Sequence, residues 1–205
     1  MSSNGKFGRF IKSIPQKITI NAPVTLGFAA VCVIVELVCM ILGERFKTKF
    51  FCVYNSPLSD PLTYLRLFTH EVGHANWSHL INNMLYILLL GPILEEKHGK
   101  SNILIAILLT ALATGIYTML AGQAAYGASG VVFAFILMVS FTGIRREHTV
   151  NLTTVLITIL YIGQEVYMAI TASGDGVGHM AHIIGGVVGG IIGFLLENKK
   201  KNSYL

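Results

Sequence analysis

Charged residues are scarce in this sequence. Asp, Glu, Lys and Arg make up only 12% of its 205 residues, where a soluble globular domain carries about 25%. Apolar residues make up 53%, and the mean hydropathy is +0.65. A soluble chain of this length has too much surface for so few charges. The composition therefore excludes a soluble enzyme and a disordered protein, and it indicates an integral membrane protein.

Cysteine is also rare, and its positions exclude two kinds of scaffold. Cys32 and Cys39 lie inside an apolar run, and Cys52 stands alone in a mixed segment. An odd number of cysteines without metal-ligand spacing argues against a disulfide framework and against a zinc scaffold. The net charge of +5 indicates basic cytoplasmic loops more than a nucleic-acid partner. We expect no cofactor and no bound nucleic acid.

Long apolar runs are what the sequence has instead. A helix that crosses a bilayer needs about 20 apolar residues, and six runs of roughly this kind predict an all-α, polytopic bundle of six transmembrane helices. Both termini then lie on the same side of the membrane. The predicted spans cover residues 24–42, 80–94, 103–120, 129–144, 152–170 and 180–196.

The organisation around these spans is simple. Residues 1–21 form a short polar and basic segment, residues 22–197 form the six-helix domain, and residues 198–205 form a basic tail. Residues 43–73 contain two prolines and scattered charges, which favours a long structured loop between the first two spans.

The distribution of Lys and Arg predicts the orientation. With the N-terminus in the cytoplasm, 11 of the 15 Lys and Arg residues fall in the terminal segments and inner loops, and four fall in the first outer loop. Basic residues accumulate on the cytoplasmic side of membrane proteins. We therefore expect both termini in the cytoplasm, in a multi-pass protein of a bacterial plasma membrane.

Polar side chains gather near the starts of the second, fourth and sixth predicted helices. These are His79 and Asn83, then Ser129, and then His182. In the predicted orientation all three helices run from the outside to the inside, so their starts lie at one depth near the outer face. Polar residues within membrane segments are rare unless they have a function. Their convergence predicts a site.

The residue types in this layer suit acyl transfer. Ser129 follows Gly127 and precedes Gly130, at a helix start whose free N–H groups favour a developing oxyanion. A serine nucleophile needs a base, and His182 can supply it if the sixth helix packs closely on the fourth. Gly185 lies one turn after His182, in a series of small-xxx-small glycines that permits close packing.

These motifs resemble those of the rhomboid family of intramembrane serine proteases. The similarity rests on GASG at 127–130, on AHIIG at 181–185 and on H-x4-H-x3-N at 74–83, and it covers about residues 24–197. It implies a six-helix protease that cleaves transmembrane segments of protein substrates near the extracytoplasmic face. It also implies a Ser129–His182 dyad without a third, acidic member, and an oxyanion site formed by His79 and Asn83.

The resemblance also implies supporting roles for other residues. His74 matches a structural histidine near the site, Arg66 an arginine of the first outer loop, and Glu95 an acid that anchors the end of the second helix. The sequence departs from many family members at Leu65, which precedes Arg66 where a tryptophan is common. It also departs at Phe133, where a tyrosine commonly stacks on the base, although an aromatic face is retained.

Three other functions are compatible with parts of the sequence. His70, Glu71 and His74 form H-E-x-x-H, which on a helix is the signature of a zinc protease. The same fold without activity would bind membrane helices. A transporter would use the intramembrane carboxylates Glu36 and Glu165, for which the sequence suggests no partner. The Ser129–His182 pair favours the serine protease, because no other interpretation requires it.

Overall fold

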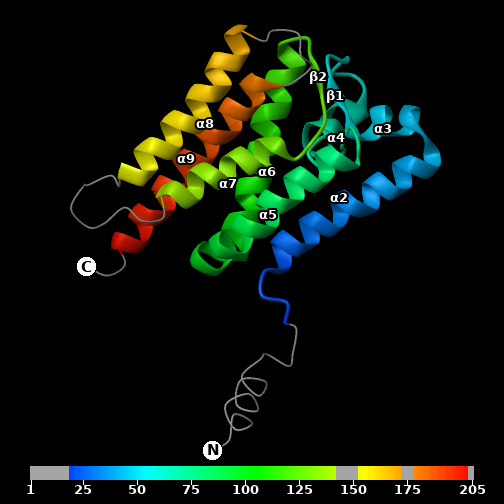
Figure 1. Cartoon of the computed structure of the whole chain (residues 1–205). Helices are drawn as coiled ribbons and strands as arrows, with labels where there is room; N and C mark the ends of the chain where they lie inside the picture. Colours follow the sequence, from blue (N-terminus) through cyan, green and yellow to red (C-terminus); the bar gives the residue numbers. More distant parts are fainter. Residues whose placement is uncertain (1–18, 142–151, 172–177, 203–205) are drawn as a thin grey trace, which may run out of the picture.

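The computed structural model describes residues 19–141, 152–171 and 178–202. It is a bundle of helices with one short antiparallel β-pair at one end (Figure 1). The elements in chain order are α2 (Pro23–Leu42), α3 (Glu44–Phe51), β1 (Val53–Tyr54), α4 (Pro61–Thr69), α5 (Trp77–His98), α6 (Lys100–Leu120), β2 (Ala124–Ala125), α7 (Ser129–Phe141), α8 (Leu152–Thr171) and α9 (His179–Asn202).

Five of these helices are long and apolar enough to cross a membrane, namely α2, α5, α6, α8 and the first 19 residues of α9. They confirm the predicted helical membrane bundle, and their bounds lie within a few residues of the predicted spans. Helix α9 continues to Asn202, so it extends into the segment predicted as a basic tail.

Helix α7 lies within the predicted fourth span, and 13 of its residues are described. Residues 142–144, which were also expected in this span, lie outside the described residues. Most of the described part of α7 is buried, including Val131, Phe135 and Met138 at 0% exposure. The helix that begins with Ser129 is therefore enclosed by other helices.

Helix starts and ends follow from local sequence signals. Pro23 occupies the first turn of α2, where its missing N–H costs nothing. The side chain of Asn76 caps α5 by accepting the His79 N–H at 2.9 Å. Gly99, at φ +86°, ends α5 and begins α6 directly. These signals fix the depth at which the polar residues of α5 lie.

The segment between α2 and α5 is folded, as expected for residues 43–73. It contains α3, β1 and α4, and β1 pairs with β2 of the loop that leads into α7. The pairing joins Val53 with Ala125 and Tyr54 with Ala124. No pattern in the sequence indicated this two-residue pair. It ties the first loop to the chain just before Ser129.

Candidate active site

The turn before α7 places Ser129 at the first position of that helix. Gly127 has φ +135° and donates its N–H to the His70 carbonyl at 2.8 Å, which holds the turn against the end of α4. A Cβ on Gly127 would lie 2.5 Å from Cε1 of His79. Glycine is therefore required both by the backbone conformation and by the imidazole that occupies the space beside it.

Glycines on α9 bring this helix into backbone contact with α7. A Cβ on Gly185 would lie 2.3 Å from the Gly130 carbonyl oxygen, and one on Gly189 would lie 2.2 Å from that of Ala134. Farther along, a Cβ on Gly193 would be 3.0 Å from the Cα of Met138. We call this contact line the glycine seam. It sets the distance between the helices that carry Ser129 and His182.

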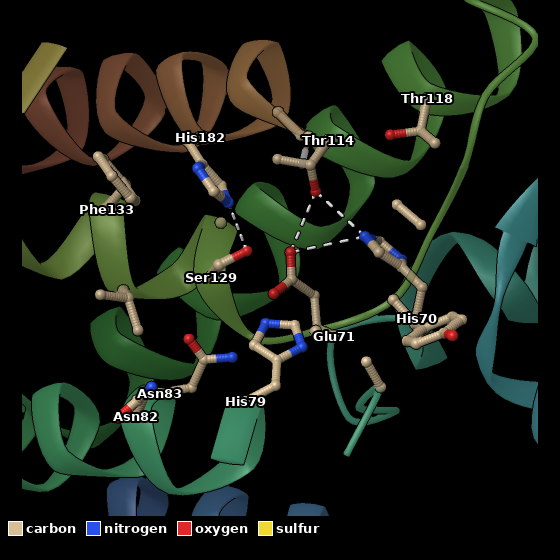
Figure 2. Close-up of a pocket in the computed structure, with 18 of the residues that line it drawn as sticks. His70, Glu71, His79, Asn82, Asn83, Thr114, Thr118, Ser129, Phe133 and His182 are labelled. Carbon is tan, nitrogen blue, oxygen red and sulfur yellow. Dashed lines mark hydrogen bonds and ion pairs between the residues drawn. The ribbon is translucent and has the colours of Figure 1, made fainter. Parts of the chain in front are cut away.

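The seam brings Ser129 and His182 into hydrogen-bonding contact. The Oγ of Ser129 lies 2.8 Å from Nε2 of His182 (Figure 2). Phe133, one turn after Ser129, stacks on the His182 ring with centroids 4.7 Å apart and planes 7° apart. The aromatic face expected at Phe133 is therefore present, and it fixes the plane of the imidazole.

An acidic residue that was not expected at this site contacts the histidine. Glu165 Oε2, on α8, lies 3.1 Å from Nδ1 of His182 and 2.7 Å from Nδ1 of His179. The sequence suggested no partner for Glu165, and the structure places it against two histidines. The sequence did show that Glu165 is a carboxylate within an apolar span, which is unusual. The spacing of residues along one helix could not indicate which neighbouring helix Glu165 would face.

His179 also contacts Glu165. It is 8% exposed and hydrogen-bonded to Glu165. Of the two histidines at the start of α9, His182 is the one that contacts Ser129. His179 contacts the carboxylate from the other side.

His79 and Asn83 project from α5 toward Ser129 (Figure 2). Asn83 is 6% exposed, and its Nδ2 has no hydrogen-bond partner among the described residues. A buried amide without an acceptor costs free energy, and here it faces the serine. Both side chains line the same cavity as Ser129.

A cavity of about 850 Å³ connects these side chains. Its lining includes Ser129, His182 and Phe133, together with the polar side chains of Glu71 and Thr114. The hydroxyl of Thr114 donates to Glu71 Oε1 at 3.1 Å. The cavity is large enough for water and part of a peptide chain.

The H-E-x-x-H residues do not lie on a helix. His70 is the residue that ends α4, and the chain from there to Asn76 is a loop. Nδ1 of His70 lies 3.0 Å from the Arg66 carbonyl, whereas Nε2 of His74 accepts the Ala128 N–H at 3.4 Å. The two imidazoles serve different partners, so the geometry of a helical zinc protease is absent from this loop.

His74 supports the turn before Ser129. It is fully buried, and its ring meets that of His79 edge-on with centroids 5.3 Å apart. Burial, followed by the neighbouring His79, lowers the pKa of His74 to about 4. A neutral His74 can accept the Ala128 N–H, which fits the structural role that the resemblance implied.

Arg66 and Glu95 lie in structural contacts that do not line the cavity. Arg66 is 2% exposed and forms an ion pair with Asp60 at 2.7 Å. The Asp60 carboxylate accepts a hydrogen bond from the Leu62 N–H and another from Arg66, and both lower the pKa of Asp60 below its ordinary value. Glu95 Oε2 accepts the N–H and the hydroxyl of Thr25 at 2.9 and 2.8 Å. One contact stabilises the first loop, and the other joins the end of α5 to the start of α2.

Glu36 also has a partner that the sequence did not suggest. Lys47 of α3 lies 3.6 Å from Glu36 Oε2, and both residues are less than a tenth exposed. Glu36 thus contacts Lys47, and Glu165 contacts two histidines. The two intramembrane carboxylates that favoured a transporter therefore have partners within the protein.

The sequence matches the family model of the Rhomboid domain over residues 61–199. The chain belongs to the rhomboid family. Among its relatives is the rhomboid protease GlpG of Haemophilus influenzae, 26% identical over 181 residues that cover 88% of this chain and 94% of the relative. The rhomboid protease GlpG of Yersinia pseudotuberculosis is 27% identical over 200 residues, which cover 95% and 69% of the two chains.

Membership of the rhomboid family agrees with the architecture. The match begins at α4 and includes every element that lines the cavity. The protein is therefore a multi-pass integral membrane protein of a family of intramembrane proteases. The histidines, the serine and the glycine seam that were identified from the sequence all lie within the matched residues.

Proposed function

We propose that this protein is an intramembrane serine endopeptidase that cleaves transmembrane segments of membrane proteins near the extracytoplasmic face. The observation that carries the proposal is the 2.8 Å contact between Ser129 Oγ and His182 Nε2, at the wall of a polar cavity. A serine in reach of an imidazole acceptor is the arrangement required for nucleophilic acyl transfer.

The reaction follows from this geometry. His182 takes the proton of Ser129 as the hydroxyl attacks the scissile carbonyl, and later gives it to the leaving amine. His79, Asn83 and the free N–H groups at the start of α7 stabilise the oxyanion. Water enters through the cavity and hydrolyses the acyl-enzyme. A helical substrate must unwind to offer its carbonyl, so we expect small and helix-breaking residues near the cut.

The proposed orientation places the cavity toward the outside. His79 and His182 lie near the starts of α5 and α9, whereas Lys97 and Glu197 pair at 3.0 Å near the other end of the same helices. The basic residues at that end support a cytoplasmic location. Both termini then lie in the cytoplasm of a bacterial cell.

The test is cleavage of a single-pass model substrate by the purified protein in liposomes. Ser129→Ala should abolish cleavage, and His182→Asn should reduce it to the same background. Ser140→Ala is the matched control, because among the described residues the Ser140 hydroxyl bonds the Ile136 carbonyl of its own helix. Cleavage that persists in Ser129→Ala would refute the mechanism. A wild-type protein that binds substrate helices without cleaving them would indicate an inactive family member.

A further inference from the structure

Two buried carboxylates lie near the proposed nucleophile, and they differ in what they contact. Glu71 Oε1 accepts from the Thr114 hydroxyl at 3.1 Å and lies 3.5 Å from Nε2 of His70. Glu165 Oε2 instead lies 3.1 Å from the Nδ1 atom of His182. Within the described part of the chain, Glu165 is the carboxylate in contact with the imidazole that meets Ser129.

The two nitrogens of His182 therefore have defined partners. A carboxylate beside Nδ1 requires a proton on that nitrogen, because an ionised carboxylate only accepts hydrogen bonds. Nε2 is then the unprotonated nitrogen, and it is the one that lies 2.8 Å from Ser129 Oγ. The tautomer that can accept the serine proton is the one that Glu165 stabilises.

We propose that Glu165 is a positioning residue that extends the Ser129–His182 pair to a Ser–His–Glu triad. It holds His182 in the Nδ1–H tautomer, and its negative charge stabilises the imidazolium formed when Nε2 takes the serine proton. The proton stays on His182 until it passes to the leaving amine, so Glu165 remains ionised throughout. This inference rests on the proposed function and deepens its mechanism.

A second donor fixes the carboxylate in place. Nδ1 of His179 lies 2.7 Å from the same Oε2 atom, and Glu165 is 8% exposed. An acceptor that is buried and bonded from two sides has little freedom to rotate away from His182. Phe133 fixes the plane of the imidazole from one face, and Glu165 fixes its rotation within that plane.

The helix that supplies Glu165 is the least enclosed of the spans. Only 11% of the residues in the most apolar stretch of α8 are buried, whereas 33% are buried in the corresponding stretch of α9. The acid thus comes from a different helix than the nucleophile and the base. The orientation of His182 accordingly depends on α8 lying against α9.

The test compares kcat and KM for a single-pass substrate in liposomes. Glu165→Gln keeps the size of the side chain but loses its charge, and we expect kcat to fall about 10²- to 10⁴-fold with little change in KM. Glu165→Asp restores the carboxylate and should recover part of the loss. The matched control is Glu36→Gln, which neutralises the other intramembrane carboxylate and leaves Lys47 without its buried partner. It should lower the melting temperature and leave kcat unchanged.

A spectroscopic measurement separates orientation from general stability. Nitrogen NMR of histidine-labelled protein, with His182→Asn used for assignment, should show His182 protonated at Nδ1 in the wild type. Glu165→Gln should shift this residue toward a mixture of the two neutral tautomers. A role of Glu165 in holding helices together would not change the tautomer of His182 in the folded protein.

Three outcomes would overturn the proposal. In the first, Glu165→Gln lowers the melting temperature as Glu36→Gln does but retains the wild-type kcat. In the second, the tautomer of His182 is unchanged. In the third, purified wild-type protein holds stoichiometric zinc, and His179→Ala loses it. Glu165, His179 and His182 would then be metal ligands, since their donor atoms lie within 4.8 Å of one another. If the wild type shows no Ser129-dependent cleavage, the proposed function fails instead.

Discussion

The glycine seam and helix α8 differ in how closely they pack against the rest of the bundle. At the seam, α7 and α9 are so close that a single added Cβ would overlap carbonyl oxygens at 2.2–2.3 Å. Helix α8 exposes most of its apolar surface, and a Cβ added to its Gly163 would meet nothing within 4 Å. The nucleophile and the base are placed by backbone contact, whereas Glu165 is placed by hydrogen bonds.

The largest effect should come from filling the seam. Gly189→Ala forces a methyl group against the Ala134 carbonyl, and we expect a loss of unfolding free energy of more than about 3 kcal/mol, together with a loss of cleavage. Gly163→Ala on α8 is the matched control and should be neutral or stabilising by up to about 1 kcal/mol. Thermal unfolding in detergent measures both. Equal melting temperatures for the two variants would remove the distinction between the regions.

A second test uses the pH dependence of stability at His74, which contacts the turn just before α7. The pKa of His74 lies near 4 in the folded protein and near 6.5 in an unfolded chain. As the pH falls from 6.5 toward 4, the unfolded chain binds a proton that the folded protein does not, so stability is lost across this window. The contribution is on the order of 3 kcal/mol. His74→Gln removes this titrating group, so its melting temperature should fall less steeply between pH 7 and pH 4.5. Parallel curves would contradict this assignment.

A smaller effect is expected for the aromatic ring on α7 that orients His182. Phe133→Ala removes a stacking contact worth about 1 kcal/mol and should lower kcat roughly tenfold. Phe133→Tyr keeps the ring and should retain most of the activity. If Phe133→Ala cleaves as fast as the wild type, the plane of His182 is set by Glu165 alone.

The smallest effect concerns the other tether of α8. The Thr154 hydroxyl donates to the Ser140 carbonyl of α7, and Thr154→Val should cost about 1 kcal/mol locally. Hydrogen exchange should increase in α8 and remain unchanged along the seam. Thr158→Val is the control, because in the described part of the chain the Thr158 hydroxyl bonds within α8, to the Thr154 carbonyl at 2.8 Å. Uniform loss of protection in α7, α8 and α9 would show that α8 is not an independent region.

The sequence predicted the helical bundle and most of the site because those signals are local. Apolar runs report membrane helices directly, and glycines at four-residue spacing report close packing. The depth of Ser129, His79 and His182 followed from counting spans. These three residues do line one cavity.

What the sequence did not reveal depends on contacts between distant segments. The β1–β2 pair involves two residues on each side, too few to produce a pattern. The partners of Glu36 and Glu165 depend on which faces of α3, α8 and α9 meet.

The most direct test of the central claim is to map a mechanism-based serine hydrolase probe on the protein. A fluorophosphonate should form one covalent adduct, on Ser129, in the wild type, and none in His182→Asn. Labelling should be slowed in Glu165→Gln and unaffected in Ser140→Ala. Substrate cleavage by a protein that forms no adduct at Ser129, or equal labelling of wild type and His182→Asn, would contradict the account.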